Sequence, residues 1–402
     1  MNVLLSAYAC DPSKGSEPAY GYNWAIGLAD LGYEVHCMTQ EVGKTQIELK
    51  VHPSKLHFHY VRVPFYFDFL YSFSQPTIYL HYLIWQWLAY NFARRLHKKN
   101  KFDIAHHVTF GSLQMGSFLY KLNIPFIFGP AGGGQTAPVA FKDYFLNHWS
   151  SEERRKKVSE LMLRYNPAFG RMIKKAKVIL ASNPETLQMA ESKGARNVFI
   201  SLDTALPETF FPDELQVRKP EAGKLRLLWI GRFLPRKGIL LLVDVMKALK
   251  GYTGISLTVV GDGEMRDAFR EKVKEFSLQE IVYWKGAVPY DQVKEFYSNH
   301  DVFIFTSLRD SGGLQLVEAM AYGLPVVTLN LHGQAIIVND ETGIRCKCET
   351  PDIAIEELKN AVIELQQNPS RVSQMSLAAF EFAKKQTWTI KIAEISRKYY
   401  SL

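Results

Sequence analysis

The sequence predicts an α/β protein built from two doubly wound parallel sheets. Short apolar runs alternate with longer helical patterns from end to end, and this alternation favours parallel strands covered by helices on both faces. The chain has 402 residues, which is too many for one ordinary core. A single sheet would need about a dozen strands, so we expect two sheets of about six strands each.

The first half of the chain supplies the strands of one sheet. Their apolar runs cover Asn2–Tyr8, Glu34–Met38, His57–Val61, Ile104–His107, Pro125–Phe128, Val178–Ala181 and Val198–Ser201. A helical pattern follows the first run at Ala19–Leu31. We therefore expect an N-terminal domain over residues 1–205.

The second half repeats this alternation. Its strand patterns are Leu225–Ile230, Ser256–Val260, Ile281–Trp284, Val302–Thr306, Pro325–Leu329 and Gly343–Cys346. Its helical patterns are Ile239–Lys250, Glu264–Glu275, Tyr290–Tyr297, Leu314–Tyr322 and Pro351–Gln367. The stretch Asp203–Lys224 has three prolines and no clear periodicity, which is typical of a linker. We expect a C-terminal domain over residues 222–385 that faces the first across a cleft, because such sheets bind ligands outside the carboxyl ends of their strands.

The chain is basic, with 48 Lys and Arg against 40 Asp and Glu and a net charge of +8. Basic runs at 94–99, 154–157 and 171–177 are consistent with solvated helix ends or with attraction to acidic lipid headgroups. No recognised nucleic-acid motif surrounds them, so we expect no nucleic acid partner. Four cysteines form no disulfide framework, and the N-terminus lacks the basic region of a signal peptide, so we expect a cytoplasmic protein.

An aromatic stretch between Val63 and Ala93 is the one segment that suggests a membrane helix. Its only formal charge is Asp68. Residues such as Pro76 and His81 interrupt the apolar run well before the roughly 20 residues that a spanning helix needs. We therefore expect either a buried aromatic helix or an interfacial one that contacts the cytoplasmic face of an anionic membrane.

The loop Gly231–Gly238 carries the sharpest functional signal. It follows a strongly apolar strand pattern and opens a helix. Gly231 permits a tight turn, and Arg232 and Lys237 can then converge on one anion. Two cations aimed at a diphosphate would neutralise the charge that builds on a leaving group. The residue order of a Walker loop is absent, and an ordinary turn with solvated basic residues fits the same letters.

A glycine-opened helix carries the second signal. Gly312 and Gly313 precede the helical pattern, and a helix N-terminus offers free N–H groups to a phosphate. Asp310 lies before this terminus and Glu318 lies on the second turn. Eight residues at ~1.5 Å rise separate the two carboxylates by on the order of 12 Å, which suits sugar hydroxyls at both ends of a nucleotide sugar.

The pattern Gly-Arg-x4-Lys-Gly, followed by an acid-x7-Glu element, resembles the retaining glycosyltransferases of family 4. The resemblance is strongest over Leu225–Gly343 and includes Gly261–Glu264 and Trp284–Val288. It implies the GT-B fold, in which two Rossmann-like domains face each other across a cleft. It also implies that the last helix, residues 386–402, packs back on the first domain.

The resemblance assigns roles to matching residues. Arg232 and Lys237 would bind the donor diphosphate, Glu318 the ribose hydroxyls, and Asp310 hydroxyls of the transferred sugar. The other donor-binding residues that it implies are Gly15, Gly231, Gly263, Val288, Ser311, Gly312, Gly313 and Leu314. The family usually has Glu, often followed by a bulky residue, where this chain has Asp310 followed by Ser311, so the donor sugar is left open.

In the first domain the resemblance is looser. Gly15 lies where the family has a Gly-rich turn near the donor phosphates and the acceptor, although a plain loop glycine fits equally well. Asp103–His107 matches a strand-end Asp-x-x-His pattern, whose histidine reaches the donor sugar in the family. Adjacent strand residues face opposite ways, so one of His106 and His107 would be catalytic and the other would lie in the core.

The implied function is transfer of a hexose, with retention of its anomeric configuration, from a nucleotide diphosphate sugar such as a UDP- or GDP-sugar. The acceptor would be a glycan or a polyprenyl-linked molecule of polysaccharide or glycoconjugate biosynthesis. We expect no cofactor and no required metal, because cations already serve the diphosphate and no D-x-D motif is in place. Two alternatives stay open: another GT-B enzyme, such as a phosphorylase or a nucleotide-sugar epimerase, and a catalytically silent sugar-binding subunit.

Overall fold

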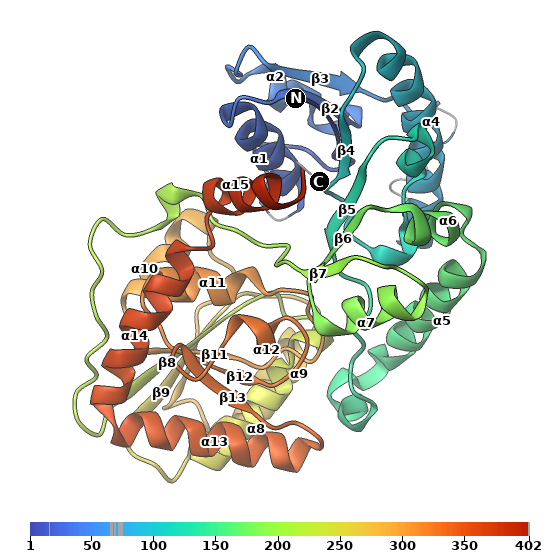
Figure 1. Ribbon diagram of the computed structural model, residues 1–402. Helices are drawn as coiled ribbons and strands as arrows, with labels where there is room; N and C mark the ends of the chain where they lie inside the picture. The colour runs from blue at the N-terminus through green and yellow to red at the C-terminus, as the bar shows by residue number, and fades with distance from the viewer. Residues whose placement is uncertain (16, 65–66, 68–69, 71–74, 401–402) are drawn as a thin grey trace. The chain divides into compact units, whose positions relative to one another are not determined.

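The computed structural model describes residues 1–15, 17–64, 67, 70 and 75–400, and the chain divides into two compact units (Figure 1). The first comprises Met1–Gly134, Lys156–Asp203 and Trp388–Leu402, and the second comprises Gln135–Arg155 and Thr204–Thr387. Each unit is built on one sheet, and all neighbouring strands are parallel. The predicted α/β class with two parallel sheets is confirmed.

The first sheet has seven strands in the order β3-β2-β1-β4-β5-β6-β7. Their bounds are β1 Asn2–Ser6, β2 Glu34–Thr39, β3 Leu56–Tyr60, β4 Ile104–His107, β5 Phe126–Ala131, β6 Val178–Ala181 and β7 Val198–Ile200. Every residue of β4, β5 and β6 is buried, as expected for a parallel sheet that is covered on both faces. By contrast, β3 is an edge strand with mostly half-buried residues.

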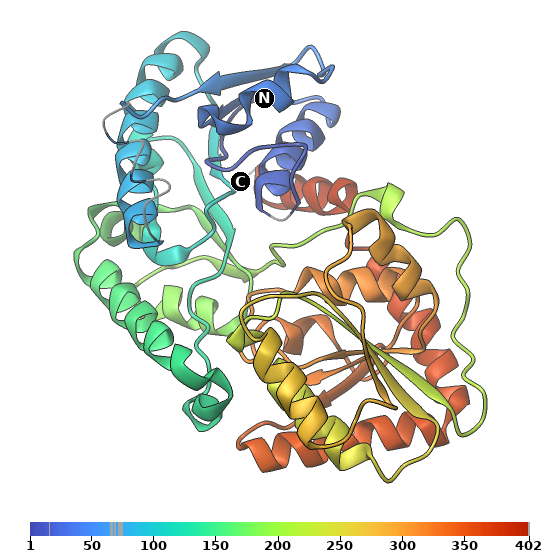
Figure 2. The ribbon, with the colours of Figure 1, turned by 180° about the vertical axis from the view of Figure 1, so that it is seen from behind.

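Helices cover both faces of this sheet. The helix α1 (Glu17–Asp30) packs against α15 (Trp388–Tyr399), and Figures 1 and 2 show the two side by side. The other α-helices that the structure describes wholly within this unit are α2 Lys44–Glu48, α4 Gln75–Asn100, α6 Pro167–Lys175 and α7 Pro184–Ser192. The helix α5 (Trp149–Tyr165) begins in residues of the second unit and ends in residues of the first.

The second sheet has six strands in the order β10-β9-β8-β11-β12-β13. Their bounds are β8 Leu225–Ile230, β9 Ile255–Val260, β10 Val282–Trp284, β11 Val302–Phe305, β12 Val326–Leu329 and β13 Gly343–Cys346. The direction of winding reverses between β8 and β11. In doubly wound sheets, ligands bind outside the carboxyl ends of the strands at such a reversal.

Helices also cover both faces of the second sheet. Their bounds are α8 Ile239–Leu249, α9 Arg266–Glu275, α10 Val293–Ser298, α11 Leu314–Ala321, α12 Gln334–Ile337, α13 Pro351–Gln367 and α14 Pro369–Lys384. The helices α8 and α13 pack together on one face, and α11 and α14 pack together on the other (Figure 1).

Residues 135–155 belong to the second unit, whereas the predicted N-terminal domain, 1–205, contained them. The reason is hydrophobic burial. Phe141, Phe145 and Trp149 are buried in the same apolar cluster as Trp229 and Phe233 of the second unit. Local periodicity shows that these residues are buried but not in which unit they pack. A domain boundary predicted from the sequence therefore places residues 135–155 in the wrong unit.

The described part of the aromatic stretch forms most of α4 and serves mainly as core. Tyr82 and Trp85 are fully buried, and their rings pack edge-on against Tyr8 at 5.1 Å. Trp87 differs, with 47% of its surface exposed. Asp68 and several aromatic residues before α4 lie outside the described residues. Among the helices that the structure describes, none has an apolar run long enough to cross a membrane.

Candidate functional site

Hydrogen bonds join the loops after β8 and β11, where the direction of winding of the second sheet reverses. The loop after β8 ends in a 3₁₀ turn, Pro235–Lys237, followed by Gly238 in the left-handed conformation at φ 67°. A Cβ atom at Gly238 would lie 2.1 Å from the carbonyl oxygen of Thr306, so this position requires glycine. Thr306 Oγ1 donates to the Gly238 carbonyl at 3.0 Å, and Leu308 N donates to the Arg236 carbonyl at 2.8 Å.

Lys237 and Asp310 form an ion pair across these two loops, although the sequence predicted separate partners for them in a bound donor. Lys237 Nζ donates to Asp310 Oδ2, and Arg236 lies 3.6 Å from the same oxygen. Burial lowers the pKa of Lys237, and the charge of Asp310 opposes that shift. Burial raises the pKa of Asp310, but Lys237 and Arg236 outweigh it and hold the pKa below its ordinary value.

Arg232 is the exposed cation of the same loop. Its positive charge lowers the pKa of Arg236 and of Lys237, which places it in their electrostatic neighbourhood. No acidic side chain among the described residues forms an ion pair with Arg232. Arg236 and Lys237 therefore share the carboxylate of Asp310, while Arg232 adds a third cation, so the loop carries a net positive charge that attracts an anion.

The start of α11 lies directly after Asp310 in the chain. Gly313 adopts the left-handed conformation at φ 71° and serves as the N-cap, and Leu314 is the first residue of the helix. Gly312 and Gly313 are buried, while Ser311 and Leu314 are half-buried. The predicted helix end is thus present, and its first N–H groups and positive dipole end favour an anion.

Glu318 lies on α11 and is buried, with 3% of its surface exposed. The hydroxyl of Tyr290 donates to Oε1 at 2.7 Å, and that of Tyr297 donates to Oε2 at 3.0 Å. Burial raises the pKa of Glu318, and the two hydroxyl groups counter part of this effect. Both carboxylate oxygens therefore have protein partners. Tyr290 is 59% exposed, so a ligand can reach and displace it more easily than the fully buried Tyr297.

The glycines of the neighbouring loops allow close packing of backbone. A Cβ atom at Gly261 would lie 1.8 Å from the carbonyl oxygen of Gly231, and one at Gly263 would lie 2.9 Å from that of Phe233. The structure thus brings the predicted residues Gly231 and Gly263 into one cluster. Val288 is half-buried and lies two residues before Tyr290, a partner of Glu318.

The predicted catalytic histidines are both core residues. His106 is fully buried, and its ring nitrogens pair with Tyr400 and with the Gly129 carbonyl, both at 2.7 Å. His107 is 1% exposed and pairs with Ser6 and Tyr82, both at 3.0 Å. Burial lowers the pKa of His106 to about 4 and that of His107 to about 3. Both rings thus have protein partners, and the expectation that one of the two faces a ligand stays a prediction.

Gly15 is exposed, and a Cβ atom there would have nothing within 4 Å. No backbone crowding therefore requires a glycine at this position. A pocket of about 280 Å³ lies elsewhere in the first unit, beyond the carboxyl ends of β2 and β3. It is lined by Gln40, Glu41, Val42, Val61, Arg62, Val63 and His81. Its polar groups and its place at the strand ends make it a second candidate ligand site.

Sequence reasoning missed three residues of the second-unit site. Arg236 lies in the predicted loop, but only its 3.6 Å approach to Asp310 shows that it shares that carboxylate. Tyr290 and Tyr297 contact Glu318 from α10 and the turn before it, and no spacing in the sequence relates them to α11.

Most of the second unit is similar to a known protein family. Residues 211–382 match the family model described as glycosyl transferases group 1. The GPI3 subunit of phosphatidylinositol N-acetylglucosaminyltransferase from Saccharomyces cerevisiae is 25% identical over 172 residues, which cover 41% of this chain and 38% of that protein. An uncharacterized glycosyltransferase, MJ1607 of Methanocaldococcus jannaschii, is 31% identical over 127 residues, or 31% of this chain and 33% of that one. The matches to these curated relatives thus span well under half of their length.

Solved structures resemble the whole chain. Sucrose-phosphate synthase from Thermosynechococcus elongatus aligns with a TM-score of 0.67 at 17% identity and covers 100% of this chain and 98% of that one. HepE of Anabaena, in complex with UDP, aligns with a TM-score of 0.64 at 14% identity over 100% of both chains. Such identities show the fold alone. Residues 211–382 therefore resemble the glycosyl transferases group 1 family, and the chain has the α/β fold of GT-B glycosyltransferases, with two parallel-sheet domains.

Proposed function

We propose that this protein is a retaining hexosyltransferase of glycosyltransferase family 4 that uses a nucleotide diphosphate sugar. The observation that carries the proposal is the excess of positive charge at the winding reversal. Arg236 and Lys237 share one carboxylate, that of Asp310, beside the N-terminus of α11, and Arg232 adds a third, exposed cation to the same loop. A diphosphate supplies the negative charge that this site lacks, and the loops after β8 and β11 hold the cations in place.

Donor binding would exchange the partners of Lys237. The diphosphate takes the place of Asp310 beside the ammonium group, and Arg232 binds the same anion from the exposed side. Asp310 is then available to accept hydrogen bonds from hydroxyl groups of the transferred sugar. Glu318 would accept hydrogen bonds from the ribose hydroxyls. These would replace the hydrogen bond from the hydroxyl of Tyr290, the more exposed of its two partners.

The transfer step follows from this arrangement. The bond between the anomeric carbon and the diphosphate oxygen breaks as the acceptor oxygen forms its bond on the same face of the sugar. The acceptor proton passes to the departing phosphate oxygen, so no separate base is required. The cations stabilise the charge of the leaving group, and for this reason we propose no required metal at the donor site.

We expect Arg232→Ala to weaken the binding of a nucleoside diphosphate at least about tenfold, the equivalent of ~1.4 kcal/mol. Arg232 is exposed and lacks a described acidic partner, so its loss removes attraction for the ligand without breaking a contact of the fold. Thermal shift titrations with UDP, GDP and their sugars would measure the effect and identify the base, because a ligand stabilises the folded state that binds it.

A matched control is Arg371→Ala, which removes an arginine of α14 that pairs with Glu364. It should bind nucleotides like the wild type. Equal binding by wild type and Arg232→Ala would contradict the donor site. Acceptor-dependent release of free nucleoside diphosphate separates a transferase from an epimerase and a phosphorylase, whereas binding without turnover on any acceptor indicates a silent sugar-binding subunit.

The acceptor belongs, in this proposal, to the pocket at the ends of β2 and β3. Arg62 and Glu41 lie 3.4 Å apart at this pocket, and His81 pairs with Tyr8 at 2.9 Å. Such polar groups suit the hydroxyls of a glycan. We propose a glycan or a polyprenyl-linked acceptor in polysaccharide or glycoconjugate biosynthesis on the cytoplasmic side of a membrane.

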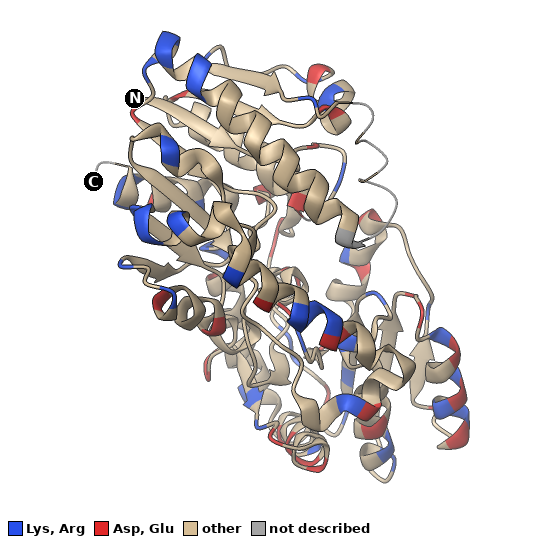
Figure 3. Ribbon diagram, turned by 90° about the vertical axis from the view of Figure 1, so that its right-hand side faces the viewer, with Lys and Arg blue, Asp and Glu red and all other residues tan. Residues whose placement is uncertain are grey.

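We also propose that the basic C-terminal end of α4 contacts the surface of an anionic membrane. Four exposed cations, Arg94, Arg95, Lys98 and Lys99, lie at its C-terminal end, where Figure 3 shows Lys and Arg gathered. We expect their replacement by glutamine to reduce sedimentation with anionic vesicles strongly, since each cation near a charged surface contributes about 1 kcal/mol.

Vesicles of neutral phosphatidylcholine provide the control for charge. A variant that loses four exposed lysines of the second unit provides the control for net charge; those lysines are Lys247, Lys250, Lys274 and Lys285. If the α4 variant sediments like the wild type, α4 is only the aromatic core helix that its buried Tyr82 and Trp85 also support.

A further inference from the structure

A cluster of titratable side chains lies on the first sheet, at its edge. The patterns Glu34-Val35-His36 on β2 and His57-Phe58-His59 on β3 alternate in the same phase. Parallel pairing sets His36 opposite His57 and Met38 opposite His59. Because alternate residues of a strand project to the same side, Glu34, His36, His57 and His59 lie on one face of the sheet.

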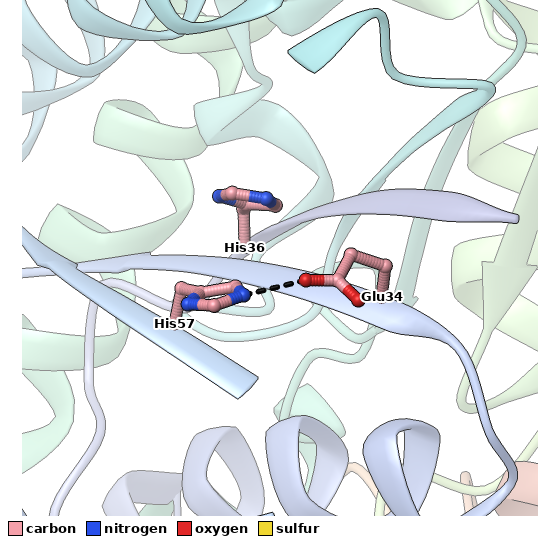
Figure 4. Close-up of side chains that lie close together, drawn as sticks. All are labelled: Glu34, His36 and His57. Carbon is pink, nitrogen blue, oxygen red and sulfur yellow. Dashed lines mark hydrogen bonds and ion pairs between the residues drawn. The ribbon is translucent and has the colours of Figure 1, made fainter. Parts of the chain in front are cut away.

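Three of these side chains, Glu34, His36 and His57, lie close together (Figure 4). One ligand atom each from Glu34, His36 and His57 lies within 4.8 Å of the other two. His57 Nε2 and Glu34 Oε1 are hydrogen-bonded at 2.5 Å. The rings of His36 and His57 lie 4.8 Å apart between centroids. Small movements of exposed side chains bring such atoms to the distances found around a bound metal ion.

The cluster has a packed wall and an open side. His36 is buried, its Nδ1 lies 2.9 Å from His59 Nε2, and Phe102 packs edge-on against it at 5.2 Å. The side chains of Glu34 and His57, in contrast, are 38% and 42% exposed. The bond between His36 and His59 fixes the orientation of the His36 ring, as an outer hydrogen bond does for metal-binding histidines. The open side admits an ion and a water ligand.

The chemistry of the three side chains points to a class of metal ion. Two imidazoles and a carboxylate suit Zn²⁺ and similar transition-metal ions, whereas Mg²⁺ and Ca²⁺ prefer oxygen ligands.

We propose that Glu34, His36 and His57 bind one divalent ion of the zinc type, with His59 as a positioning residue and water as a further ligand. Binding breaks the hydrogen bond between His57 Nε2 and Glu34 Oε1: the proton of that bond moves to His57 Nδ1, and Nε2 and Oε1 each form a bond to the ion. The ion would fasten the edge strand β3 to β2. This site belongs to the first unit, so it does not depend on the donor site proposed for the second.

The test uses the full chain with any purification tag removed and metals stripped by a chelator. We expect ZnCl₂ to raise the melting temperature of the wild type and to bind with a stoichiometry of about one in calorimetry. CoCl₂ should produce the visible absorption bands of a low-symmetry Co²⁺ site. Glu34→Gln and His57→Gln, which keep size and exposure, should each weaken Zn²⁺ binding at least about tenfold.

A close control exists in the second unit. His148 and Glu264 also form an exposed pair, at 3.8 Å, with side chains 41% and 45% exposed. His148→Gln should bind Zn²⁺ and Co²⁺ like the wild type. The proposal is overturned if the wild type shows no stoichiometric binding, or if the Glu34 and His57 variants bind as the wild type does. Either result would leave the cluster as a hydrogen-bonded surface pair beside two packed histidines.

Discussion

Lys237→Ala is expected to lower the rate of transfer by about 10²–10³-fold, the loss typical of removing one preorganised group that stabilises developing charge. The ammonium of Lys237 is held in place by burial, by Asp310 and by the ring of Phe305 at 5.2 Å. Because alanine cannot replace that charge, the diphosphate leaving group loses its least mobile cation. Steady-state kinetics of nucleotide release would measure the effect.

A comparison with Asp310→Asn separates donor binding from a purely structural ion pair. In the free protein, Asp310 competes with the ligand for Lys237. Asp310→Asn should therefore bind a free nucleoside diphosphate as tightly as the wild type or more tightly, yet transfer slowly because the sugar hydroxyls lose their acceptor. Lys237→Ala should weaken both the nucleoside diphosphate and the nucleotide sugar. If the two variants weaken the free nucleoside diphosphate equally, the pair supports the fold and the exchange of partners is wrong.

The pair of Lys272 and Asp244 gives a matched control within the same unit. Their side chains lie 2.7 Å apart, and Asp244 is as exposed as Asp310, at 16%. Lys272→Ala removes a comparable ion pair that lies outside the proposed site. It should cost stability without changing nucleotide affinity, and a loss of affinity there would show that destabilisation alone explains the Lys237 result.

The central strands of each sheet were predictable from the sequence because most of their residues are buried. The predicted runs Ile104–His107 and Leu225–Ile230 coincide with β4 and β8, because strands buried in this way read as short, mostly apolar runs. The excursion at 135–155 was not predictable, because its residues pack in a core whose strands begin only at Leu225. The local hydrophobic pattern indicates that a residue is buried, but it does not indicate which unit the residue packs into.

The candidate site also has features that the sequence predicted and features that it did not. Gly238 and Gly313 were predictable, because each opens a helix in a conformation that glycine favours. The pairing of Lys237 with Asp310 was not, since the two residues are 73 positions apart and opposite charges mark either mutual partners or separate ligand contacts. The pairing of His106 with the hydroxyl of Tyr400 was not predictable either, because a strand-end histidine pairs as readily with a buried hydroxyl as with a ligand.

Glu318→Gln is expected to raise the melting temperature at neutral pH and to lower kcat/KM for the donor at least about tenfold. Burial raises the pKa of Glu318, so the folded protein holds its charged form at a cost. Glutamine fills the same space and can bond both Tyr290 and Tyr297 without a charge. Ribose hydroxyls, however, would lose an ionised acceptor, and bonds to charged groups contribute about 1.5–3 kcal/mol each.

The stability gained by Glu318→Gln should depend on pH in one direction, whereas a gain from packing alone would not depend on pH. A raised pKa means that the folded state binds the proton of Glu318 more tightly than the unfolded chain does, so wild-type stability falls as pH rises through the ordinary value of 4.5 toward the folded pKa. The gain from glutamine should therefore be largest near neutral pH and vanish on acidification below 4.5, where the wild-type side chain is protonated in both states. Tyr297→Phe should act in the opposite direction, because it removes a donor from a buried carboxylate and makes the charged form still less stable. If the melting temperature of Glu318→Gln shows no such pH dependence, burial does not destabilise the charged carboxylate. If kcat/KM is unchanged, the carboxylate does not contact the donor.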